Sequence, residues 1–255
     1  MPTAEGHAHP APAAVRVNDY DNFAESYAAQ NETSLENAHI ERPAMLALAG
    51  DVSGRRILDA GCGAGPLLAT LHDRGAHVTG LDSSAKMLEL ARRRLGDDAD
   101  LHLADLAEPL PLPDGTFDDV VCSLVLHYLE DWGPTLTELR RVLRPGGRLI
   151  ASVMHPFVDY MMQDPRPNYF ATSTWTDEWS DLVGRAAPMN FWRRPLHAMT
   201  DAFTGAGFRL TVINEPKVDP AARELSPEEF DYPKLGFLIF VAEVPQAPPV
   251  PGAAG

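Results

Sequence analysis

The chain has 255 residues, 45% of them hydrophobic, and its formal net charge at pH 7 is −15. These values are typical of a folded globular protein and exclude a wholly disordered or collagen-like chain. The acidic excess repels nucleic acid and anionic membrane surfaces, which favours small or cationic ligands as partners. No apolar run approaches the roughly 18 residues that a membrane-spanning helix needs.

Two cysteines, Cys62 and Cys122, are too few for a disulfide framework or a four-cysteine zinc site. The first residues have neither the basic nor the apolar region of a secretory signal. Both features predict a cytoplasmic protein. Residues 1–17 and 245–255 are rich in Ala and Pro and are expected to be disordered tails, so we expect a single domain over residues 18–244.

Segments typical of strands and helices alternate within this domain. A helical region at 19–48 comes first, and short apolar runs then predict buried strands at 55–60, 77–81, 101–103, 118–123, 148–153, 208–214 and 235–244. Between them, helices are expected at 66–74, from a cap at Ser83 or Ser84 to about 95, at 134–143, and from 195 to 205 or 207. Residues 144–147 (RPGG) predict a turn. The alternation predicts an α/β fold with a mostly parallel sheet covered by helices.

Residues 156–192 interrupt this alternation. The segment holds eight of the 20 Trp, Tyr and Phe residues of the chain. A packing cluster under a long loop is one interpretation. The favoured interpretation is a lid or substrate wall, because long loops are more often functional and such folds bind ligands at the carboxyl ends of their strands.

A glycine-rich loop at residues 59–65 (DAGCGAG) follows the first predicted strand and opens a helix. Glycine adopts positive φ and lets the backbone approach a ligand closely. Dinucleotide-binding loops have the pattern G-x-G-x-x-G, but here Pro66 takes the place of the third glycine. This departure disfavours a nicotinamide oxidoreductase and suits a ligand without phosphate, such as S-adenosylmethionine.

Acidic residues at successive strand ends fit the same ligand. Asp82 ends the second strand, where a carboxylate accepts hydrogen bonds from both ribose hydroxyls. Asp105 follows the third strand, at the position for an exocyclic adenine amine. Asp59 is placed to meet the cationic amino group of the methionine part. One glycine loop is weak evidence, whereas three acids at these places make it strong.

The chain resembles the class I S-adenosylmethionine-dependent methyltransferases, in particular small-molecule members of the ubiquinone-biosynthesis type. The matching segments are ILDAGCGAGPL, GLDSSAKML, HLADLAEPLPLPDGTFDDVVCSLVLHYL and LRPGGRLIASVMHP. The front segment YDNFAESYAAQNE and the late RRPLHAMTDAFTGAGFRLTVINEP are also similar to family members. The resemblance implies a Rossmann-like, doubly wound seven-stranded sheet whose last strand is antiparallel, and it allows a homodimer.

The resemblance also implies roles for individual residues. Gly61 and Gly63 would lie under the methionine part, and the carbonyl of Ser123 would face its amino group. The residues implied around the adenine are Ser83, Met87, Asp105 and Leu106. Tyr20 and Tyr27 would close the site from the N-terminal helix, although plain core packing is an equal alternative for Tyr27.

Two histidines are candidates for a general base, because imidazole titrates near neutral pH. His127 follows the fourth strand and His155 follows the fifth, and a structural role is the alternative for each. Arg193 and Arg194 are expected to be a solvated charge pair rather than a carboxylate clamp. The chain has no clustered carboxylates after the fourth strand and no zinc motif, so we expect no metal.

The sequence therefore predicts a metal-independent methyltransferase. It would use S-adenosylmethionine, release S-adenosylhomocysteine, and methylate an O, N or C atom of a small, partly aromatic or apolar metabolite. The alternative is a protein of the same fold and cofactor site that catalyses another reaction, such as a cyclisation. Formation of S-adenosylhomocysteine that depends on an acceptor would distinguish the two.

Overall fold

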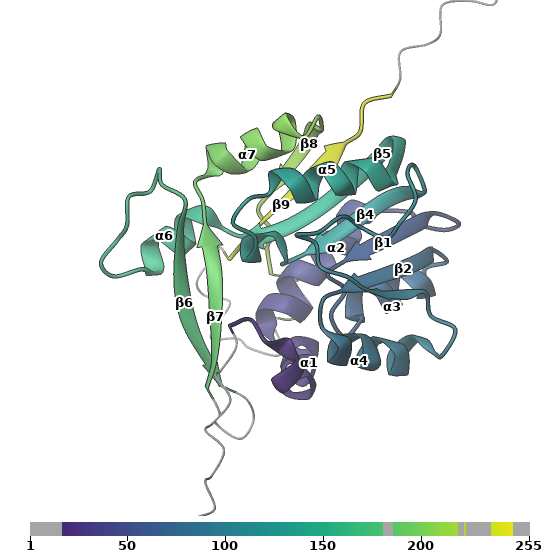
Figure 1. The fold of residues 1–255 in the computed structure, drawn as a ribbon, viewed down its shortest axis with the longest axis horizontal. Helices are drawn as coiled ribbons and strands as arrows, with labels where there is room; N and C mark the ends of the chain where they lie inside the picture. The colour runs from purple at the N-terminus through teal and green to yellow at the C-terminus, as the bar shows by residue number, and fades with distance from the viewer. Residues whose placement is uncertain (1–16, 181–185, 219–221, 223–235, 247–255) are drawn as a thin grey trace, which may run out of the picture.

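One sheet of seven strands dominates the computed structural model, which describes residues 17–180, 186–218, 222 and 236–246. The strands lie in the order β3-β2-β1-β4-β5-β9-β8 (Figure 1). Strand β9 runs antiparallel to both of its neighbours, and the pairs from β3 to β5 are parallel. The bounds are β1 Arg56–Ala60, β2 His77–Asp82, β3 Leu101–Leu103, β4 Phe117–Ser123, β5 Leu143–Met154, β8 Arg209–Asn214 and β9 Phe237–Glu243. The predicted fold is confirmed.

Helices cover both faces of this sheet. Apolar side chains of α2 and α3 pack on one face, and those of α5 and α7 pack on the other. Helix α4 lies beside α3 and β3 (Figure 1). The bounds are η1 Tyr20–Asn22, α1 Ala24–Thr33, η2 Asn37–Glu41, α2 Arg42–Ala49, α3 Pro66–Asp73, α4 Ala85–Leu95, η3 Leu126–Tyr128, α5 Gly133–Val142 and α7 Leu196–Gly205. The predicted helical region at 19–48 is thus four shorter pieces, of which η2 is a π-helical turn.

The strand order reverses between β1 and β4, because the chain moves outward from β1 through β2 to β3 and then returns. In such sheets a crevice opens at the carboxyl ends of the strands where the order reverses. The glycine loop after β1 and the segment after β4 therefore face one another across this crevice. The predicted tails at 1–17 and 245–255 lie almost wholly outside the described residues.

The turn predicted at residues 144–147 is wrong. Strand β5 is continuous from Leu143 to Met154, and its register against β4 shifts between Phe117 and Asp119. Gly146 adopts φ +78°, so the extra residues form a bulge inside the strand. Glycine and proline mark such irregularities in a strand as readily as they mark a turn.

The loop expected at residues 156–192 is also largely regular structure. It begins with the short helix α6 (Pro156–Met162), and an antiparallel hairpin follows, formed by β6 (Ser173–Ser180) and β7 (Ala186–Arg193). Trp175 pairs with Phe191, and Thr176 with Asn190, so the aromatic and β-branched residues fit a pleated surface. Figure 1 shows this hairpin standing beside the central sheet, next to α6.

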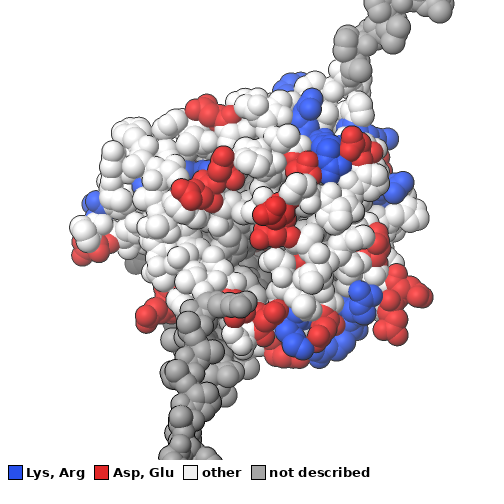
Figure 2. Space-filling model, viewed as in Figure 1, with Lys and Arg blue, Asp and Glu red and all other residues white. Residues whose placement is uncertain are grey.

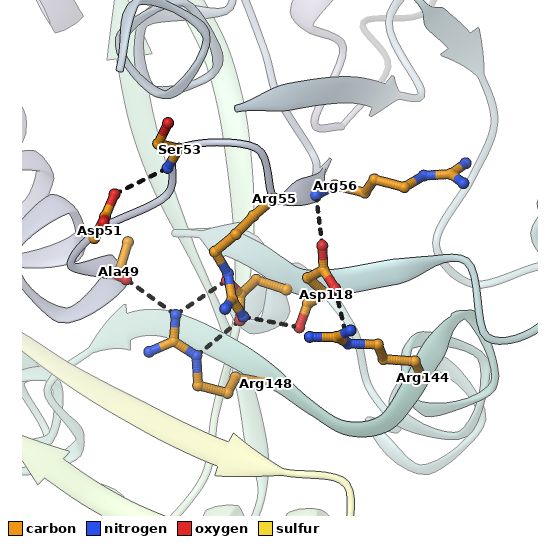
Figure 3. Close-up of polar contacts among 9 residues, drawn as sticks. Ala49, Asp51, Ser53, Arg55, Arg56, Asp118, Arg144 and Arg148 are labelled. Atoms are coloured by element: carbon orange, nitrogen blue, oxygen red, sulfur yellow. Dashed lines mark hydrogen bonds and ion pairs between the residues drawn. The ribbon is translucent and has the colours of Figure 1, made fainter. Parts of the chain in front are cut away.

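A buried ion cluster joins β1, β4 and β5 near their amino ends (Figure 3). Asp119 is only 1% exposed and accepts two hydrogen bonds from Arg55, at 2.5 and 2.8 Å, and two from Arg148, at 2.8 and 3.0 Å. Arg148 also donates to the carbonyl of Ala49 at the end of α2. One buried carboxylate thereby ties three strands and a helix together at the end of the sheet opposite the crevice.

We expect Asp119→Ala to lower the free energy of unfolding by about 3–5 kcal/mol, because it leaves two partly buried guanidinium groups without their anion. Urea unfolding monitored by circular dichroism measures this loss. Glu89→Gln is the control, since it breaks the exposed Lys86–Glu89 pair and should leave the unfolding midpoint unchanged. Equal midpoints for wild type and Asp119→Ala would contradict the assignment.

Candidate active site

The glycine loop lies at the centre of the crevice. Gly61 has φ +86°, and a β-carbon there would lie 2.3 Å from a methyl carbon of Val125, so the residue has to be glycine. Gly63 has φ +53° with open space where its side chain would be. The loop therefore presents bare backbone to the crevice, as the sequence predicted.

Asp82 fixes this loop to the second strand. Its carboxylate accepts hydrogen bonds from the amides of Gly63 and Ser84, both at 2.8 Å. Ser84, rather than Ser83, caps α4, because its hydroxyl accepts from the amide of Met87. Burial raises the pKa of Asp82, and these backbone donors act in the opposite direction. Asp82 thus lies at the edge of the crevice with lone pairs available for a diol.

Asp59, at the end of β1, is only 1% exposed, and no described neighbour offsets the cost of burying its carboxylate. Neither of its carboxylate oxygens has a hydrogen-bond partner among the residues that the structure describes. Burial, followed by the negative charges of Asp82 and Glu41, raises the pKa of Asp59 to about 8. Such a group is matched by a ligand that brings a cation, and the ammonium group of S-adenosylmethionine fits this requirement.

Two adjoining cavities share the loop. The larger, of about 430 Å³, runs past Asp82 and Asp105, and the smaller, of about 70 Å³, contains Asp59. All residues predicted to bind the cofactor line one or both cavities: Tyr20, Tyr27, Asp59, Gly61, Gly63, Asp82, Ser83, Met87, Asp105, Leu106 and Ser123. Their individual cofactor contacts stay predictions, but the fold does bring them together.

The far end of the larger cavity shows two local supports. Asp105 is exposed and accepts a hydrogen bond from the amide of Ala107 at 2.9 Å, so its second oxygen remains for a ligand. Leu106 is buried, and its carbonyl accepts from the hydroxyl of Thr135 at 2.8 Å. These contacts fix the loop after β3 beside the larger cavity.

Aromatic rings from three parts of the chain pack together beside the crevice. Tyr20 and Tyr27 come from the N-terminal region, Tyr128 from η3, and Trp179 and Phe191 from the hairpin. The hydroxyls of Tyr20 and Tyr128 form a hydrogen bond, and the Tyr27 ring stacks on Trp179 with centroids 5.8 Å apart. Burial raises the pKa of all three tyrosines, so their hydroxyls stay protonated and neutral.

The two candidate bases lie in different surroundings. His127 is buried beside this aromatic group, 4.6 Å from the Tyr128 ring and 5.4 Å from the Phe191 ring by centroids. Its Nδ1 has no partner in the described part of the chain, and burial lowers its pKa to about 3. His155 instead caps α6 through Nδ1, and its Nε2 lies 3.1 Å from Glu215. Neither histidine lines either cavity.

The solvated charge pair expected at Arg193 and Arg194 is wrong, because both residues are buried. Arg193 donates to the carbonyls of Asn168, Tyr169 and Ala171. Arg194 donates to two carbonyls after η3 and lies over the Trp132 ring, 4.3 Å from its centroid. Arg193 therefore ties the end of the hairpin to an earlier part of the insertion, and Arg194 holds the residue after the hairpin against the core.

Sequence reasoning missed Glu41, Arg42 and Asn31, which line the smaller cavity, and Tyr128, which lines the larger one. Glu41 is 2% exposed, and Glu41 and Arg42 precede β1 in a helical stretch outside the matching segments. Asn31 lies near the end of the front matching segment, which implied no role for it. Within the described residues, no cluster of three His, Cys, Asp or Glu side chains is arranged to hold a metal ion. None of the described helices is long and apolar enough to cross a bilayer.

The raised pKa of Asp59 predicts how the affinity for the ligand depends on pH. Below about pH 8 the carboxyl group is mostly protonated, and binding of an ammonium group favours the ionised form. The affinity for S-adenosylhomocysteine should therefore rise between about pH 6.5 and 8.5, by at most tenfold per pH unit. Isothermal titration calorimetry across this range measures the slope.

Asp59→Asn should weaken binding and flatten the slope, whereas Asp105→Asn, in the other cavity, should keep it. A slope that survives in Asp59→Asn would rule out this group as the source. The ligand-free protein gives an independent check. Because the raised pKa removes stability as the pH rises toward 8, Asp59→Asn should raise the Tm more at pH 8 than at pH 5.

Comparison with known proteins agrees with this geometry. A family model described as "Methyltransferase domain" matches residues 58–151. The ubiquinone/menaquinone biosynthesis C-methyltransferase of Desulfotalea psychrophila is 32% identical over 175 residues, which cover 64% of this chain and 70% of that protein. The demethylmenaquinone methyltransferase of Clavibacter sepedonicus is 39% identical over 51% of this chain and 54% of its own length. The chain thus spans between about half and 70% of these relatives.

A solved structure extends the match to nearly the whole described fold. The crystal structure of an S-adenosylmethionine-dependent methyltransferase from Mesorhizobium loti is 30% identical and has a TM-score of 0.67. The match covers 84% of this chain and 99% of that one. With the seven-stranded sheet, the glycine loop and the acids at its strand ends, these findings show that the chain belongs to the class I S-adenosylmethionine-dependent methyltransferases, whose cofactor is S-adenosylmethionine.

Proposed function

We propose that the protein transfers a methyl group from S-adenosylmethionine to an O, N or C atom of a small, partly aromatic or apolar metabolite. The aromatic group beside the larger cavity supports this proposal most directly. Its rings come from the N-terminal region, η3 and the hairpin, and its hydroxyls and imidazole are neutral. A flat, largely uncharged acceptor matches such a surface, because rings provide large contact areas with few rotatable bonds to freeze.

The charge distribution agrees with an uncharged acceptor. Figure 2 shows few charged side chains over α6 and the hairpin, whereas acidic and basic groups gather near α4. The pairs Glu25–Arg93 and Lys86–Glu89 belong to the α4 side. Arg193, the last residue of β7, is engaged with backbone carbonyls and is not available to an anionic acceptor.

The rate of methyl transfer then depends mainly on how the protein positions the acceptor relative to the methyl group. Bound S-adenosylmethionine supplies an already activated methyl group, so the protein has to hold a nucleophile in line with it and exclude water. We assign ribose binding to Asp82, ammonium binding to Asp59, and water exclusion to Tyr20, Tyr128 and Phe191. We further propose that no metal takes part and that the insertion at 156–192 is the substrate lid. A cytoplasmic location and a homodimer remain predictions.

His127 is the better placed of the two histidines. Its ring lies within the aromatic group, but a pKa of about 3 makes it a weak base, so we assign it a hydrogen bond that orients the acceptor. His155 is engaged at both nitrogens and holds the start of α6. Proton removal by a side chain is then needed only if the acceptor is not already nucleophilic.

The first test is turnover. Incubation with S-adenosylmethionine and a panel of phenolic, quinol and amine acceptors should form S-adenosylhomocysteine only when an acceptor is present, as measured by liquid chromatography with mass spectrometry. EDTA should leave the rate unchanged. Restoration of an EDTA-inhibited rate by a divalent ion would overturn metal independence. Conversion of a bound substrate without S-adenosylhomocysteine formation would favour the alternative, a cyclisation.

The second test separates the histidines. His127→Ala should raise the acceptor KM roughly tenfold and change kcat little, because it removes an orienting contact. His155→Ala should leave kcat/KM within about threefold and lower the Tm, because it removes the cap of α6. If His155→Ala instead slowed turnover by roughly 10²–10⁴-fold, with unchanged affinity for S-adenosylhomocysteine, His155 would be established as the general base.

A further inference from the structure

Glu41 is a buried acid that none of the assignments above uses. It ends the π-helical turn η2, well before β1 in the chain, and is 2% exposed. The hydroxyls of Ser123 and Ser152 donate to its Oε1 at 2.8 and 2.5 Å. Its other oxygen, Oε2, has no hydrogen bond to any residue that the structure describes. A carboxylate buried with only two neutral donors is incompletely compensated.

The nearest basic residue in sequence does not hydrogen-bond to Glu41. The guanidinium of Arg42 donates to the carbonyl and side-chain oxygens of Asn31, at 3.1 and 2.5 Å. Burial raises the pKa of Glu41. The hydrogen bonds from the two serines and the positive charge of Arg42 lower it, but burial has the larger effect. The negative charge of Glu41 is also among the causes of the raised pKa of Asp59. Both acids therefore favour the approach of a cation.

The smaller cavity carries both signs of charge. Glu41 and Asp59 line it together with Arg42 and Asn31. A simple metal cation would need only the acids, whereas the amino-acid end of S-adenosylmethionine carries an ammonium and a carboxylate together. The cavity volume of about 70 Å³ also suits a compact group rather than a ring. This combination fits a zwitterion.

Ser152 connects Glu41 to the wall of the larger cavity. Its hydroxyl donates to Glu41 and accepts from the amide of Leu124 at 3.0 Å. Leu124 has φ +54°, a left-handed conformation that is unfavourable for a leucine unless other contacts impose it. Leu124 lines both cavities and stands just before η3, which carries His127 and Tyr128. The Glu41–Ser152 contact therefore helps to impose the turn on which the aromatic wall is built.

We propose that Glu41 binds the ammonium group of S-adenosylmethionine beside Asp59 and, through Ser152, holds the turn at Leu124 that separates the cofactor from the acceptor. The proposal deepens the assigned cofactor site and rests on the proposed function for its acceptor side. It assigns a binding role to a residue that lies outside the glycine loop and the strand-end acids.

Two ligands that differ only at the amino-acid end test the first part of the proposal, that Glu41 binds the ammonium group. S-adenosylhomocysteine carries the ammonium and carboxylate, and 5′-methylthioadenosine has the same adenosine and thioether without them. In Glu41→Gln, calorimetry should show S-adenosylhomocysteine bound at least tenfold more weakly and 5′-methylthioadenosine within twofold of wild type. Asp82→Asn, the control, should weaken both ligands, because it acts on the ribose.

Equal weakening of both ligands in Glu41→Gln would mean that Glu41 acts only through the fold, and unchanged binding of both would place the ammonium elsewhere. Either result overturns the proposal. If the variant does not fold, titrations of Asp59→Asn in buffers of different ionisation enthalpy decide, because Asp59 then contributes no proton. Net proton release should still accompany S-adenosylhomocysteine and be absent for 5′-methylthioadenosine, and equal release for the two would overturn the proposal. None of these measurements requires turnover, so they remain informative if methyl transfer fails.

Ser152→Ala tests the second part of the proposal, that Ser152 holds the turn at Leu124. It should raise the acceptor KM at least fivefold while the affinity for 5′-methylthioadenosine stays within twofold, because the turn at Leu124 loosens and the adenosine contacts remain. Thr204→Ala is the control, since it removes an exposed hydroxyl that bonds only to carbonyls of its own helix α7. An unchanged acceptor KM in Ser152→Ala, or an equal rise in Thr204→Ala, would show that Ser152 does not position this turn.

Discussion

A carboxylate buried in a protein has to be matched by a cation or by hydrogen-bond donors, and the two ends of the central sheet meet this constraint differently. Asp119, near the amino ends, and Asp59, at the carboxyl end of β1, are both 1% exposed. Arg55 and Arg148 surround the first with four hydrogen bonds, whereas the second has no partner among the described residues. The amino end is therefore a self-contained anchor, and the carboxyl end is chemically complete only with a cationic ligand.

The anchor matters to the site because it fixes the strands that carry the site. Arg55 precedes β1, Asp119 is on β4 and Arg148 is on β5, so the three strands are held in register at one end. At the other end the same strands deliver Asp59 and the two serines that contact Glu41. A slip of one residue would turn each of these side chains to the opposite face. The ion cluster thus contributes to the geometry of a crevice that it does not touch.

Much of this arrangement was predictable from the sequence, and the physical reason is that its signals are local. Each strand-end acid follows a short apolar run, and the carboxyl ends of parallel strands meet at one edge. Glu41 has no such signal, since a helical segment gives no indication of which side chain will face a crevice formed by later strands. The partners of Arg193 and Arg194 are backbone carbonyls on loops distant in sequence. The aromatic composition identified the insertion. Its hairpin, however, depends on cross-strand pairs such as Trp175 with Phe191, and the order of residues along one strand does not show which residues of the other strand they will face.

The same acids that suit the cofactor weaken the protein without it. Burial raises the pKa of Asp59, Asp82 and Glu41, so each of them opposes folding more as the pH rises and its ionised form is favoured. A ligand that brings an ammonium group reverses the sign of this effect, because the ionised carboxylate then has a partner. Affinity for the cofactor should be greatest under the conditions in which the ligand-free fold is least stable. Stability and binding are therefore linked through one set of protons, and Ser152 extends that link from Glu41 to the turn at Leu124.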